Sequence, residues 1–475
     1  MKLGFKQQLE GDLLKSFGFA PTHDQAKALN LLAGFCLSLS PNEVFILTGY
    51  AGTGKTSLVK SLVKSLPNYK RKVVLLAPTG RAAKVMAQYS YKKAFTIHKY
   101  IYRPKKSGGE MAQFSLRENN ATNTLFVVDE ASMIGDSGHD ASLSSGSLLQ
   151  DLFQFVRNGV NCKLLLVGDD AQLPPVGSEK SPALQSSYLE LQFGSHCTEV
   201  QLQEVMRQTQ DSQVLQNATQ IRAQIANQQF WQPQFLQGKD AIRLVEGYEV
   251  EDALNESFSE VGREGTAVLV RSNKRAGLYN QQIRARILWQ EDEISAGDFL
   301  MVVKNNYFWL PDSSKASFIA NGDTIELLQI FELIELYGYR FARAKVQMVD
   351  YPDEAPFECH LLLNTLDMPT PALPWEEAKL FYQKVLEDYP EIKSKYKKHQ
   401  EVQKNPFFNA LQVKFAYAIT CHKAQGGQWQ NVFVEKPWQP TDDVDVEYLR
   451  WLYTACTRAQ KKLYFIGFPD ANFIE

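Results

Sequence analysis

The chain has 475 residues, of which 44% are hydrophobic and 22% are charged, and its formal net charge is −2 at pH 7. This composition excludes a mostly disordered chain, and the length allows about three domains. The near-neutral charge also excludes a polybasic protein that coats nucleic acid with its whole surface, so any polyanion site must be a local groove.

Short apolar runs in the first 200 residues are each followed by small or polar residues and then by a helix-like segment. This alternation predicts a parallel α/β domain with strands buried on both faces. A sparser second set of runs predicts a second sheet of the same kind. The first set is 44–47, 73–76, 125–128 and 164–167, and the second set is 267–270, 413–419, 432–434 and 463–466.

Two regions break the α/β pattern. Residues 99–122 are polar, and Lys105 to Gly109 in their middle have the composition of a hairpin tip. Residues 291–411 mix short strand-like runs with one charged helical stretch, Trp375 to Gln403. Both regions are therefore predicted to be insertions outside the two sheets.

The segment Gly49–Thr56 reads Gly-Tyr-Ala-Gly-Thr-Gly-Lys-Thr and fits G-x-x-x-x-G-K-[ST] between a predicted strand and a predicted helix. Its glycines let backbone N–H groups turn toward a polyphosphate, Lys55 supplies charge to the terminal phosphates, and Thr56 offers a hydroxyl to Mg²⁺. The alternative, a glycine-rich turn without a ligand, is disfavoured by the strand–loop–helix context. The predicted phosphate contacts are Gly49, Ala51, Gly52, Thr53, Gly54, Lys55, Thr56 and Ser57.

Two further strand ends carry polar groups. Asp129 and Glu130 follow the run 125–128; Asp129 is suited to hold Mg²⁺ through water, and Glu130 to take a proton from an attacking water. Gln172, in the loop after the run 164–167, is suited to orient that water or to sense the γ-phosphate. A solvated acidic pair and a proline-stiffened turn are the simpler readings, but the joint occurrence with Lys55 favours a nucleotide hydrolase.

These three elements, in this order, resemble those of superfamily 1 helicases, and further segments extend the resemblance over residues 22–460. Ala77–Ala83 resembles motif Ia, Thr96–Lys99 motif Ib, Leu202–Gln208 motif IV, Ala418–Gly426 motif V and Tyr453–Ala459 motif VI. The sequences Thr-Gly-Arg-Ala-Ala and His-Lys-Ala-Gln-Gly are similar to the 1B branch, with its RecD-like and Dda-like members. In motif V, Ala424 replaces the common serine, as in Dda-like members.

The resemblance implies an α/β fold with two RecA-like parallel-sheet P-loop NTPase domains, a small hairpin insertion and an SH3-like β accessory domain. We expect domain 1A at residues 1–98 and 123–185 and hairpin 1B at residues 99–122. We expect domain 2A at residues 186–290 and 412–475, and accessory domain 2B with a helical extension at residues 291–411.

The resemblance also implies roles for three more residues. Gln25 would recognise adenine, because its side-chain amide both donates and accepts hydrogen bonds. Arg207 and Arg458 would reach the γ-phosphate from domain 2A and complete a catalytic set with Lys55, Glu130 and Gln172. An ordinary surface glutamine and surface salt bridges are the alternatives.

A track for single-stranded DNA is implied at the strand ends of both sheets, where open α/β folds bind ligands. The implied contacts are Pro78, Thr79, Arg81, Thr96 and His98 on one domain, and Thr420, His422, Lys423 and Gly426 on the other. The two histidines also fit buried structural positions. Four aromatic residues would either stack bases or pack in the core and hairpin: Tyr100, Tyr102, Phe308 and Trp309.

The function implied by the resemblance is an ATP-dependent DNA helicase that moves 5′ to 3′ on single-stranded DNA and unwinds duplex, with ATP and Mg²⁺ as cofactors. Single-stranded and forked DNA are the expected partners, together with single-stranded-DNA-binding, replication, repair or recombination proteins, and we expect a monomer without membrane contact. Three alternatives stay open: a RecD-type motor subunit of a nuclease complex, an RNA-directed enzyme, and a nucleotide-gated nucleic-acid-binding module without productive unwinding.

The cysteines indicate the compartment. None belongs to a Cys-x-x-Cys pair, which suits a reducing cytosol and disfavours a zinc ribbon. They are Cys36, Cys162, Cys197, Cys359, Cys421 and Cys456. No apolar run approaches the ~20 residues that span a bilayer, and the N-terminus lacks the apolar core of a signal peptide. We therefore expect a cytoplasmic protein.

Overall fold

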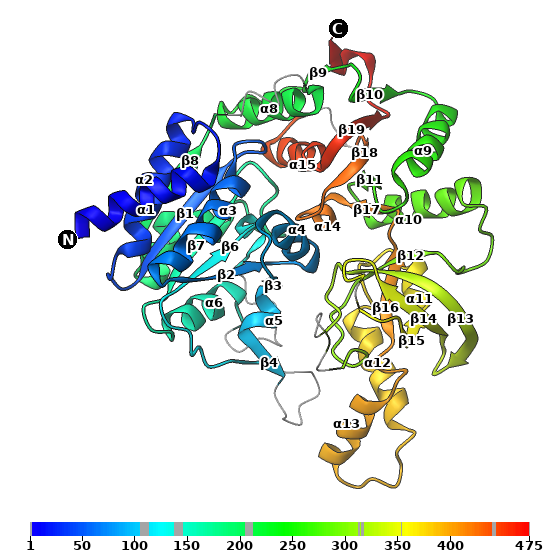
Figure 1. Cartoon of the computed structure of the whole chain (residues 1–475). Helices are drawn as coiled ribbons and strands as arrows, with labels where there is room; N and C mark the ends of the chain where they lie inside the picture. The colour runs from blue at the N-terminus through cyan, green and yellow to red at the C-terminus, as the bar shows by residue number, and fades with distance from the viewer. Residues whose placement is uncertain are drawn as a thin grey trace.

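The computed structural model describes residues 2–104, 114–136, 146–204, 212–311, 314, 318–352, 354–438 and 443–474. It has three parts: a first lobe up to residue 204, a second lobe built from 212–298 and 416–474, and a barrel between residues 299 and 415. Figure 1 shows the first lobe in blue to teal and the barrel in yellow. Among the described residues, no helix is long and apolar enough to cross a membrane.

The first lobe is built around a six-stranded parallel sheet with strand order β3-β2-β6-β7-β1-β8. Its strands are β1 (Glu43–Gly49), β2 (Lys72–Ala77), β3 (Ala94–Thr96), β6 (Thr124–Val128), β7 (Lys163–Gly168) and β8 (His196–Leu202). β6 and β7 are buried along their whole lengths. The four runs predicted in this region are thereby confirmed as strands of one parallel sheet.

Helices cover both faces of this sheet. Because side chains alternate along a strand, Phe45 and Leu47 of β1 pack in one core with α1 (Lys2–Phe17), α2 (His23–Leu37), α3 (Lys55–Ser65) and α4 (Gly80–Ser90). Val44 and Ile46 pack in the other core with α5 (Ile97–Ile101), α6 (Leu148–Arg157) and α7 (Ser186–Phe193). All strands are parallel, so their carboxyl ends meet at one edge, where the polar loops lie.

One predicted boundary needs correction. The sequence division assigned residues 186–290 to the second domain, but β8 pairs with β1 from Glu43↔His196 to Gly49↔Leu202. β8 is thus the edge strand of the first sheet, and α7 also packs on the first lobe. The apolar pattern of a strand does not tell which of two similar sheets it joins.

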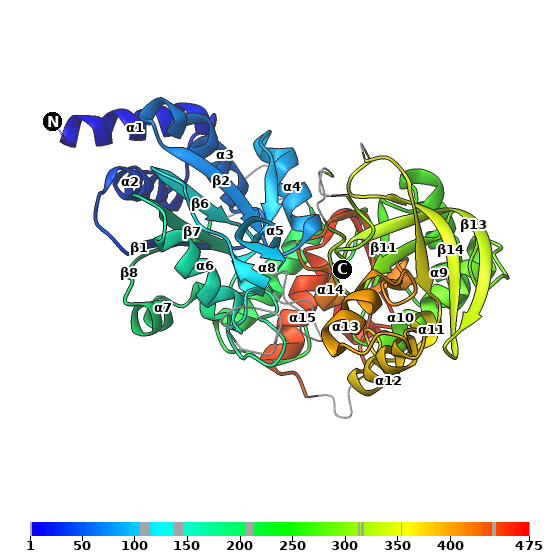
Figure 2. The same cartoon turned by 90° about the horizontal axis from the view of Figure 1, so that it is seen from below.

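The second lobe has a five-stranded parallel sheet with order β10-β19-β18-β11-β17. The strands are β10 (Ala241–Leu244), β11 (Thr266–Val270), β17 (Ala418–Thr420), β18 (Trp429–Glu435) and β19 (Ala459–Ile466). The helices are α8 (Gln213–Ala226), α9 (Gly247–Val261), α10 (Asn273–Gln282), α14 (Cys421–Ala424) and α15 (Val446–Cys456). Eight of the eleven residues of α15 are buried, and Figure 2 shows this helix beside the first lobe.

The accessory domain is a closed five-stranded barrel. Its strands are β12 (Phe299–Val302), β13 (Thr324–Leu336), β14 (Tyr339–Met348), β15 (Phe357–Leu362) and β16 (Leu411–Phe415). β16 closes the barrel by pairing antiparallel with β12 and parallel with β15. The predicted single strand over 413–419 is therefore wrong, because the run divides between β16 of the barrel and β17 of the second sheet.

Two appendages complete the fold. The predicted charged helix Trp375 to Gln403 is two helices, α12 (Trp375–Leu386) and α13 (Lys395–Lys404), which follow the short α11 (Asn364–Asp367) and project from the barrel (Figure 1). In the predicted hairpin region, β4 (Tyr102–Pro104) pairs antiparallel with β5 (Phe114–Leu116). The predicted tip Lys105 to Gly109 lies outside the described residues.

Candidate functional site

The phosphate loop joins β1 to α3 and depends on glycine at three positions. Gly52 and Gly54 take left-handed φ values of 79° and 87°, which L side chains rarely adopt. A Cβ added to Gly49 would lie 2.8 Å from Thr53 Oγ1. Thr53 is fully buried, and its hydroxyl donates within the loop to the Tyr50 carbonyl at 2.8 Å. The loop therefore opens onto the N-terminus of α3, which is an anion site.

Lys55 is the first residue of α3, and its ammonium folds back over the loop. It donates to the carbonyl oxygens of Gly49 and Tyr50, the latter at 2.9 Å. The next residue, Thr56, is exposed, and Ser57 is half-buried. The structure thus brings the predicted ammonium and hydroxyl groups together at one helix start.

Acidic residues follow the two neighbouring strands β6 and β7. Asp129 Oδ2 accepts from the Tyr89 hydroxyl at 2.7 Å, and Asp129 Oδ1 accepts from the Glu130 N–H at 2.9 Å. Glu130 has a left-handed φ of 53° and is half-buried. After β7, Asp169 is 1% exposed, and its Oδ1 accepts from the Ala171 N–H at 3.0 Å.

The charges around Glu130 come from both lobes. Burial raises the pKa of Glu130; the positive charges of Arg458 and Lys55 oppose this shift, and the negative charges of Asp129 and Asp169 reinforce it. A carboxyl group with a raised pKa beside a phosphate loop is suited to proton transfer. The structure therefore gathers these residues of the predicted catalytic and metal sets around one point.

Tyr453 of α15 joins the second lobe to the phosphate loop. Its hydroxyl accepts from the Ala51 N–H at 3.1 Å and donates to Asp169 Oδ2 at 2.7 Å. At the next residue of α15, Thr454 Oγ1 accepts from the Leu173 N–H at 2.9 Å. A residue of the second lobe thus holds a backbone N–H that the sequence analysis assigned to phosphate.

Of the two arginines predicted to reach the γ-phosphate, only Arg458 lies among the described residues. Arg458 is 3% exposed, and its guanidinium donates to Thr454 O at 3.1 Å, Gly427 O at 3.2 Å and Thr457 Oγ1 at 3.2 Å. It is therefore held by its own lobe while its charge acts on Glu130. Arg207 lies outside the described residues.

Two glutamines lie beneath the loop and beside it. Gln25 is fully buried: its Nε2 donates to Thr53 O at 2.9 Å and its Oε1 accepts from the Thr22 N–H at 3.0 Å. Gln25 thus supports the phosphate loop from below, and its contact with adenine stays a prediction. Gln172 is 6% exposed, and its Oε1 has no hydrogen-bond partner within the described part of the chain.

The predicted strand contacts of the first lobe share one edge of the sheet, because Ala77 of β2 pairs with Thr96 of β3. Two of them cap helices: Thr79, which follows Pro78, accepts from the Ala82 N–H at 3.2 Å, and Thr96 accepts from the Lys99 N–H at 3.2 Å. The ring of His98 lies 5.7 Å from that of Tyr102. The threonines therefore shape the two loops, and each hydroxyl accepts a backbone N–H while its own hydrogen can still be donated.

The predicted contacts of the second lobe meet this edge at Gly426. A Cβ on Gly426, whose φ is 72°, would lie 2.7 Å from Ala82 Cβ and 3.2 Å from Thr79 Oγ1. Arg81 stacks across the same junction on Trp429, with Cζ 3.9 Å from the ring centroid. The loops of motifs Ia and V are thus in direct contact, and the Arg81 guanidinium lies between the lobes.

The remaining second-lobe contacts are on or beside α14. Thr420 occupies the N-cap position, without a side-chain cap bond. Burial lowers the pKa of His422, so this imidazole is neutral at pH 7. Lys423 Nζ donates to Asn321 Oδ1 of the barrel at 2.5 Å.

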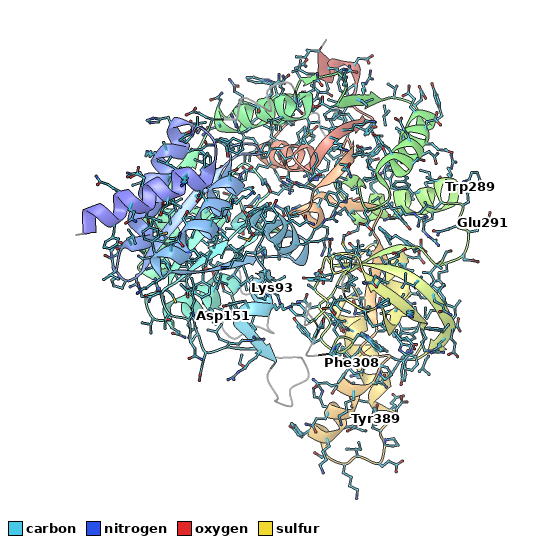
Figure 3. The ribbon with its side chains drawn as sticks, in the orientation of Figure 1. Lys93, Asp151, Trp289, Glu291, Phe308 and Tyr389 are labelled. Carbon is cyan, nitrogen blue, oxygen red and sulfur yellow. The ribbon has the colours of Figure 1, made fainter. Side chains whose placement is uncertain are left out.

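The aromatic residues divide between core and surface. Tyr100 packs edge-on against Phe126 in the first-lobe core. Tyr102 is 4% exposed and donates to Asp151, the residue labelled in Figure 3, at 2.6 Å. Both tyrosine rings therefore pack against the first-lobe core, as the alternative to base stacking predicts. On the barrel, Phe308 is 38% exposed and lies edge-on to Trp309, with ring centroids 4.9 Å apart.

Sequence reasoning missed three site residues. Tyr453 and Asp169 lie inside segments that were recognised as motifs, yet their partnership joins positions 284 residues apart. Tyr89, which binds Asp129, lies on α4 and carries no motif signal. No group of three or more His, Cys, Asp or Glu side chains that could hold a metal ion is found among the described residues.

Two family models match the chain. An AAA domain matches residues 20–246, which include the whole first lobe after α1, and a UvrD-like helicase C-terminal domain matches residues 415–466. The first match contains the phosphate loop, and the second contains Tyr453 and Arg458. The nucleotide-binding fold predicted for the chain is thereby confirmed.

The chain is similar to proteins of known and unknown role. It is 22% identical to the ATP-dependent DNA helicase dda of phage T4 over 88% of this chain and 93% of that protein. It is 33% identical to the ATP-dependent RecD2 DNA helicase of Deinococcus radiodurans over 33% of this chain, but spans only 18% of that protein. It is 26% identical to an uncharacterised protein of Methanocaldococcus jannaschii over 94% of this chain and spans 39% of that relative.

Among solved structures, that of a Bacteroides Pif1 helicase in complex with ADP-AlF3 and single-stranded DNA aligns with 96% of this chain and 95% of its own, at 15% identity and a TM-score of 0.48. The family assignment stands on the two family models and the sequence relatives. The chain belongs to superfamily 1B, the RecD-, Pif1- and Dda-like branch of the ATP-dependent DNA helicases.

Proposed function

We propose that this protein moves 5′ to 3′ along single-stranded DNA and unwinds duplex DNA ahead of it, driven by ATP hydrolysis between its two lobes. One observation supports this proposal above the others: the second lobe reaches the phosphate loop through Tyr453, and its Arg458 acts on Glu130. A nucleotide that binds in this position lies between two lobes, so its binding and hydrolysis bias how the lobes close.

In the proposed reaction, the loop N–H groups and Lys55 bind the β- and γ-phosphates, and Ser57 lies beside them in the first turn of α3. Glu130, with its raised pKa, takes the proton of the attacking water that Gln172 orients. Arg207 and Arg458 neutralise charge that develops on the γ-phosphate. Arg458 must leave its contacts with Thr454 and Gly427 to do so, which makes its action dependent on lobe closure.

The residues present suit a Mg²⁺ ion. Thr56 offers an exposed hydroxyl, and each Asp129 oxygen accepts one hydrogen bond and keeps a lone pair for a metal-bound water. Oxygen donors of this kind, with retained waters and phosphate oxygens, are what Mg²⁺ prefers. When bound, the ion would stabilise negative charge on the β- and γ-phosphate oxygens.

The proposed strand path crosses the junction of the two lobes at Thr79 and Gly426 and continues past Thr96 and His98 on one side and Thr420 and Lys423 on the other. Hydroxyls, backbone N–H groups and a few cations bind sugar and phosphate without reading sequence. As part of the same proposal, the hairpin that contains β4 and β5 would separate the duplex. The cytoplasm is the proposed compartment, in keeping with six free cysteines.

A forked or tailed duplex tests the proposal. Two labelled duplexes that differ only in carrying a 5′ or a 3′ single-stranded tail are incubated with protein, MgATP and a trap strand. We expect strand separation of the 5′-tailed duplex alone, and none without ATP. Separation of only the 3′-tailed duplex would refute the direction, and separation of neither would refute the motor. The ATPase rates with DNA and RNA strands of one sequence would decide between the two nucleic acids.

A further inference from the structure

A tight turn at Ala320–Asp323, just before β13, contacts both lobes. Asp323 closes the turn: its Oδ2 accepts from the Ala320 N–H at 2.7 Å, and its own N–H donates to Ala320 O at 3.0 Å. Gly322 has a left-handed φ of 97° and donates to Val302 O of β12 at 2.8 Å. These bonds fix the turn on the barrel.

The Asp323 carboxyl lies against the first residue of α4. A Cβ added to Gly80 would lie 2.3 Å from Asp323 Oδ1, so the approach requires glycine. Asp323 is 1% exposed, and its Oδ1 has no hydrogen-bond partner among the residues that the structure describes. One turn along α4, Lys84 Nζ contacts Asp350 Oδ1 of the barrel at 3.4 Å. The barrel therefore covers the N-terminal turn of α4.

Asn321 of the same turn contacts the second lobe. Its Oδ1 accepts from Lys423 Nζ at 2.5 Å, while its N–H donates to Asn305 Oδ1 at 2.7 Å. The turn thus contacts Gly80, which lies between the predicted strand contacts Thr79 and Arg81, and also Lys423, which is itself a predicted strand contact. A single short segment of the barrel sits where the strand-binding loops of the two lobes meet.

We propose that Asn321 and Asp323 determine the affinity of the protein for a nucleic-acid strand by competing with it for these two loops; the inference rests on the function proposed above. A phosphate that binds at the start of α4 needs the space that the Asp323 carboxyl fills, because the backbone N–H groups at a helix start bind anions. A phosphate that binds Lys423 must approach an ammonium that Asn321 already holds by one of its hydrogens.

A strand can displace the barrel from α4 because two buried carboxylate oxygens in this contact lack hydrogen-bond partners in the described part of the chain. Asp323 Oδ1 and Asp350 Oδ2 are both buried and lack hydrogen-bond partners within the described ranges. Burial, reinforced by the charge of Asp350, raises the pKa of Asp323 to about 8. Unsatisfied buried oxygens disfavour the closed contact, so a strand regains that cost when it moves the barrel away.

The first test is Asn321→Ala, which removes one competing group without changing charge at an exposed position. Binding of a fluorescein-labelled oligothymidine is measured by anisotropy at fixed salt without nucleotide. We expect about three- to tenfold tighter binding, the range for one lost hydrogen-bond competitor, with the salt dependence unchanged. The matched control is Gln329→Ala, an exposed polar position on β13, which should bind as the wild type does.

Two further variants address Asp323. Asp323→Ala empties the space over Gly80, and Asp367→Ala removes an exposed carboxylate that lines the same cavity as Thr420 and Lys423, so the pair separates competition from general charge. Asp323→Ala also loses the turn bond to the Ala320 N–H, so it is compared with Asn321→Ala, which keeps that bond. We expect tighter binding for Asp323→Ala than for Asp367→Ala.

The outcomes separate the two proposals. Unchanged or weaker strand binding by Asn321→Ala overturns the competition, and so does an Asp323→Ala gain no larger than that of Asp367→Ala. A wild-type protein that binds no strand would instead refute the proposed function and this inference with it.

Discussion

Lys55 illustrates how much a single residue of the phosphate loop controls. In the structure its ammonium is held by two loop carbonyls, and ATP would replace them with β- and γ-phosphate oxygens. We predict that Lys55→Ala lowers strand-stimulated ATP hydrolysis by about two to three orders of magnitude, because one charge that stabilises the transferred phosphoryl group is lost. Phosphate release measures the rate. Lys64→Ala, exposed in the last turn of the same helix, should hydrolyse ATP at the wild-type rate, and a Lys55→Ala rate above a tenth of it would contradict the assignment.

Functional side chains can be predicted from sequence where their position depends only on the neighbouring residues of the chain. Asp129 and Glu130 follow a buried strand and lie beside the loop, because parallel strands end at one edge. The sequence does not predict the hydrogen bond from the Ala51 N–H to the Tyr453 hydroxyl, because that contact depends on how the two lobes dock. Nor does residue type tell which way an aromatic ring faces, as Tyr102 in the first-lobe core demonstrates.

The α15 helix is the element through which the second lobe contacts the nucleotide site. We predict that Tyr453→Phe lowers the free energy of unfolding by about 1–3 kcal/mol, because Asp169 Oδ2 loses the donor that satisfies it in a buried position. Urea denaturation of the nucleotide-free protein measures the change. Tyr448→Phe is the matched control on the same helix: its hydroxyl is buried without a partner among the described residues, so its removal should cost little. Equal losses for the two variants would rule out a specific role for the Tyr453 hydroxyl.

A buried ion pair joins the segment that follows α10 to Asp298, the residue directly before the first barrel strand β12. Arg284 Nε and one of its terminal nitrogens donate to the two Asp298 oxygens at 3.0 and 3.1 Å, and Asp298 is fully buried. We predict that Asp298→Ala destabilises the protein by about 3–5 kcal/mol, because the guanidinium is left buried without its partner. Glu332→Gln breaks an exposed pair with Arg343 on the barrel and should cost less than about 1 kcal/mol. Comparable denaturation midpoints for the two variants would contradict this anchoring role.

Helices and strands are easier to predict from the sequence than the sheet that each strand joins. Periodicity identified the strand at 413–419 but not that it breaks between the barrel and the second sheet, because both halves are equally apolar and buried. For the same reason β8, at residues 196–202, was assigned to the wrong lobe. Pairing is decided by long-range packing, which a local pattern does not contain.

The charge balance of the whole molecule limits how many ionic contacts it can make with a single DNA strand. The net charge is −2, and the predicted strand contacts include two cationic side chains, Arg81 and Lys423, while burial lowers the pKa of His422 and leaves it neutral at pH 7. Each phosphate neutralised on a single strand contributes about −0.7 to the slope of log K against log salt. We therefore predict a shallow slope of about −1.4, measured by oligothymidine anisotropy across a salt series.

Two lysine variants test whether the salt dependence comes from the proposed DNA path between the lobes. Lys423→Ala should reduce the magnitude of the slope by about 0.7, because one phosphate contact is lost, whereas Lys64→Ala on the first lobe should leave it unchanged. A wild-type slope of about −4 or steeper would require several more cations than the junction of the two lobes supplies. The strand would then bind another surface, and a charge-poor track gripped through hydroxyls and backbone N–H groups would be excluded.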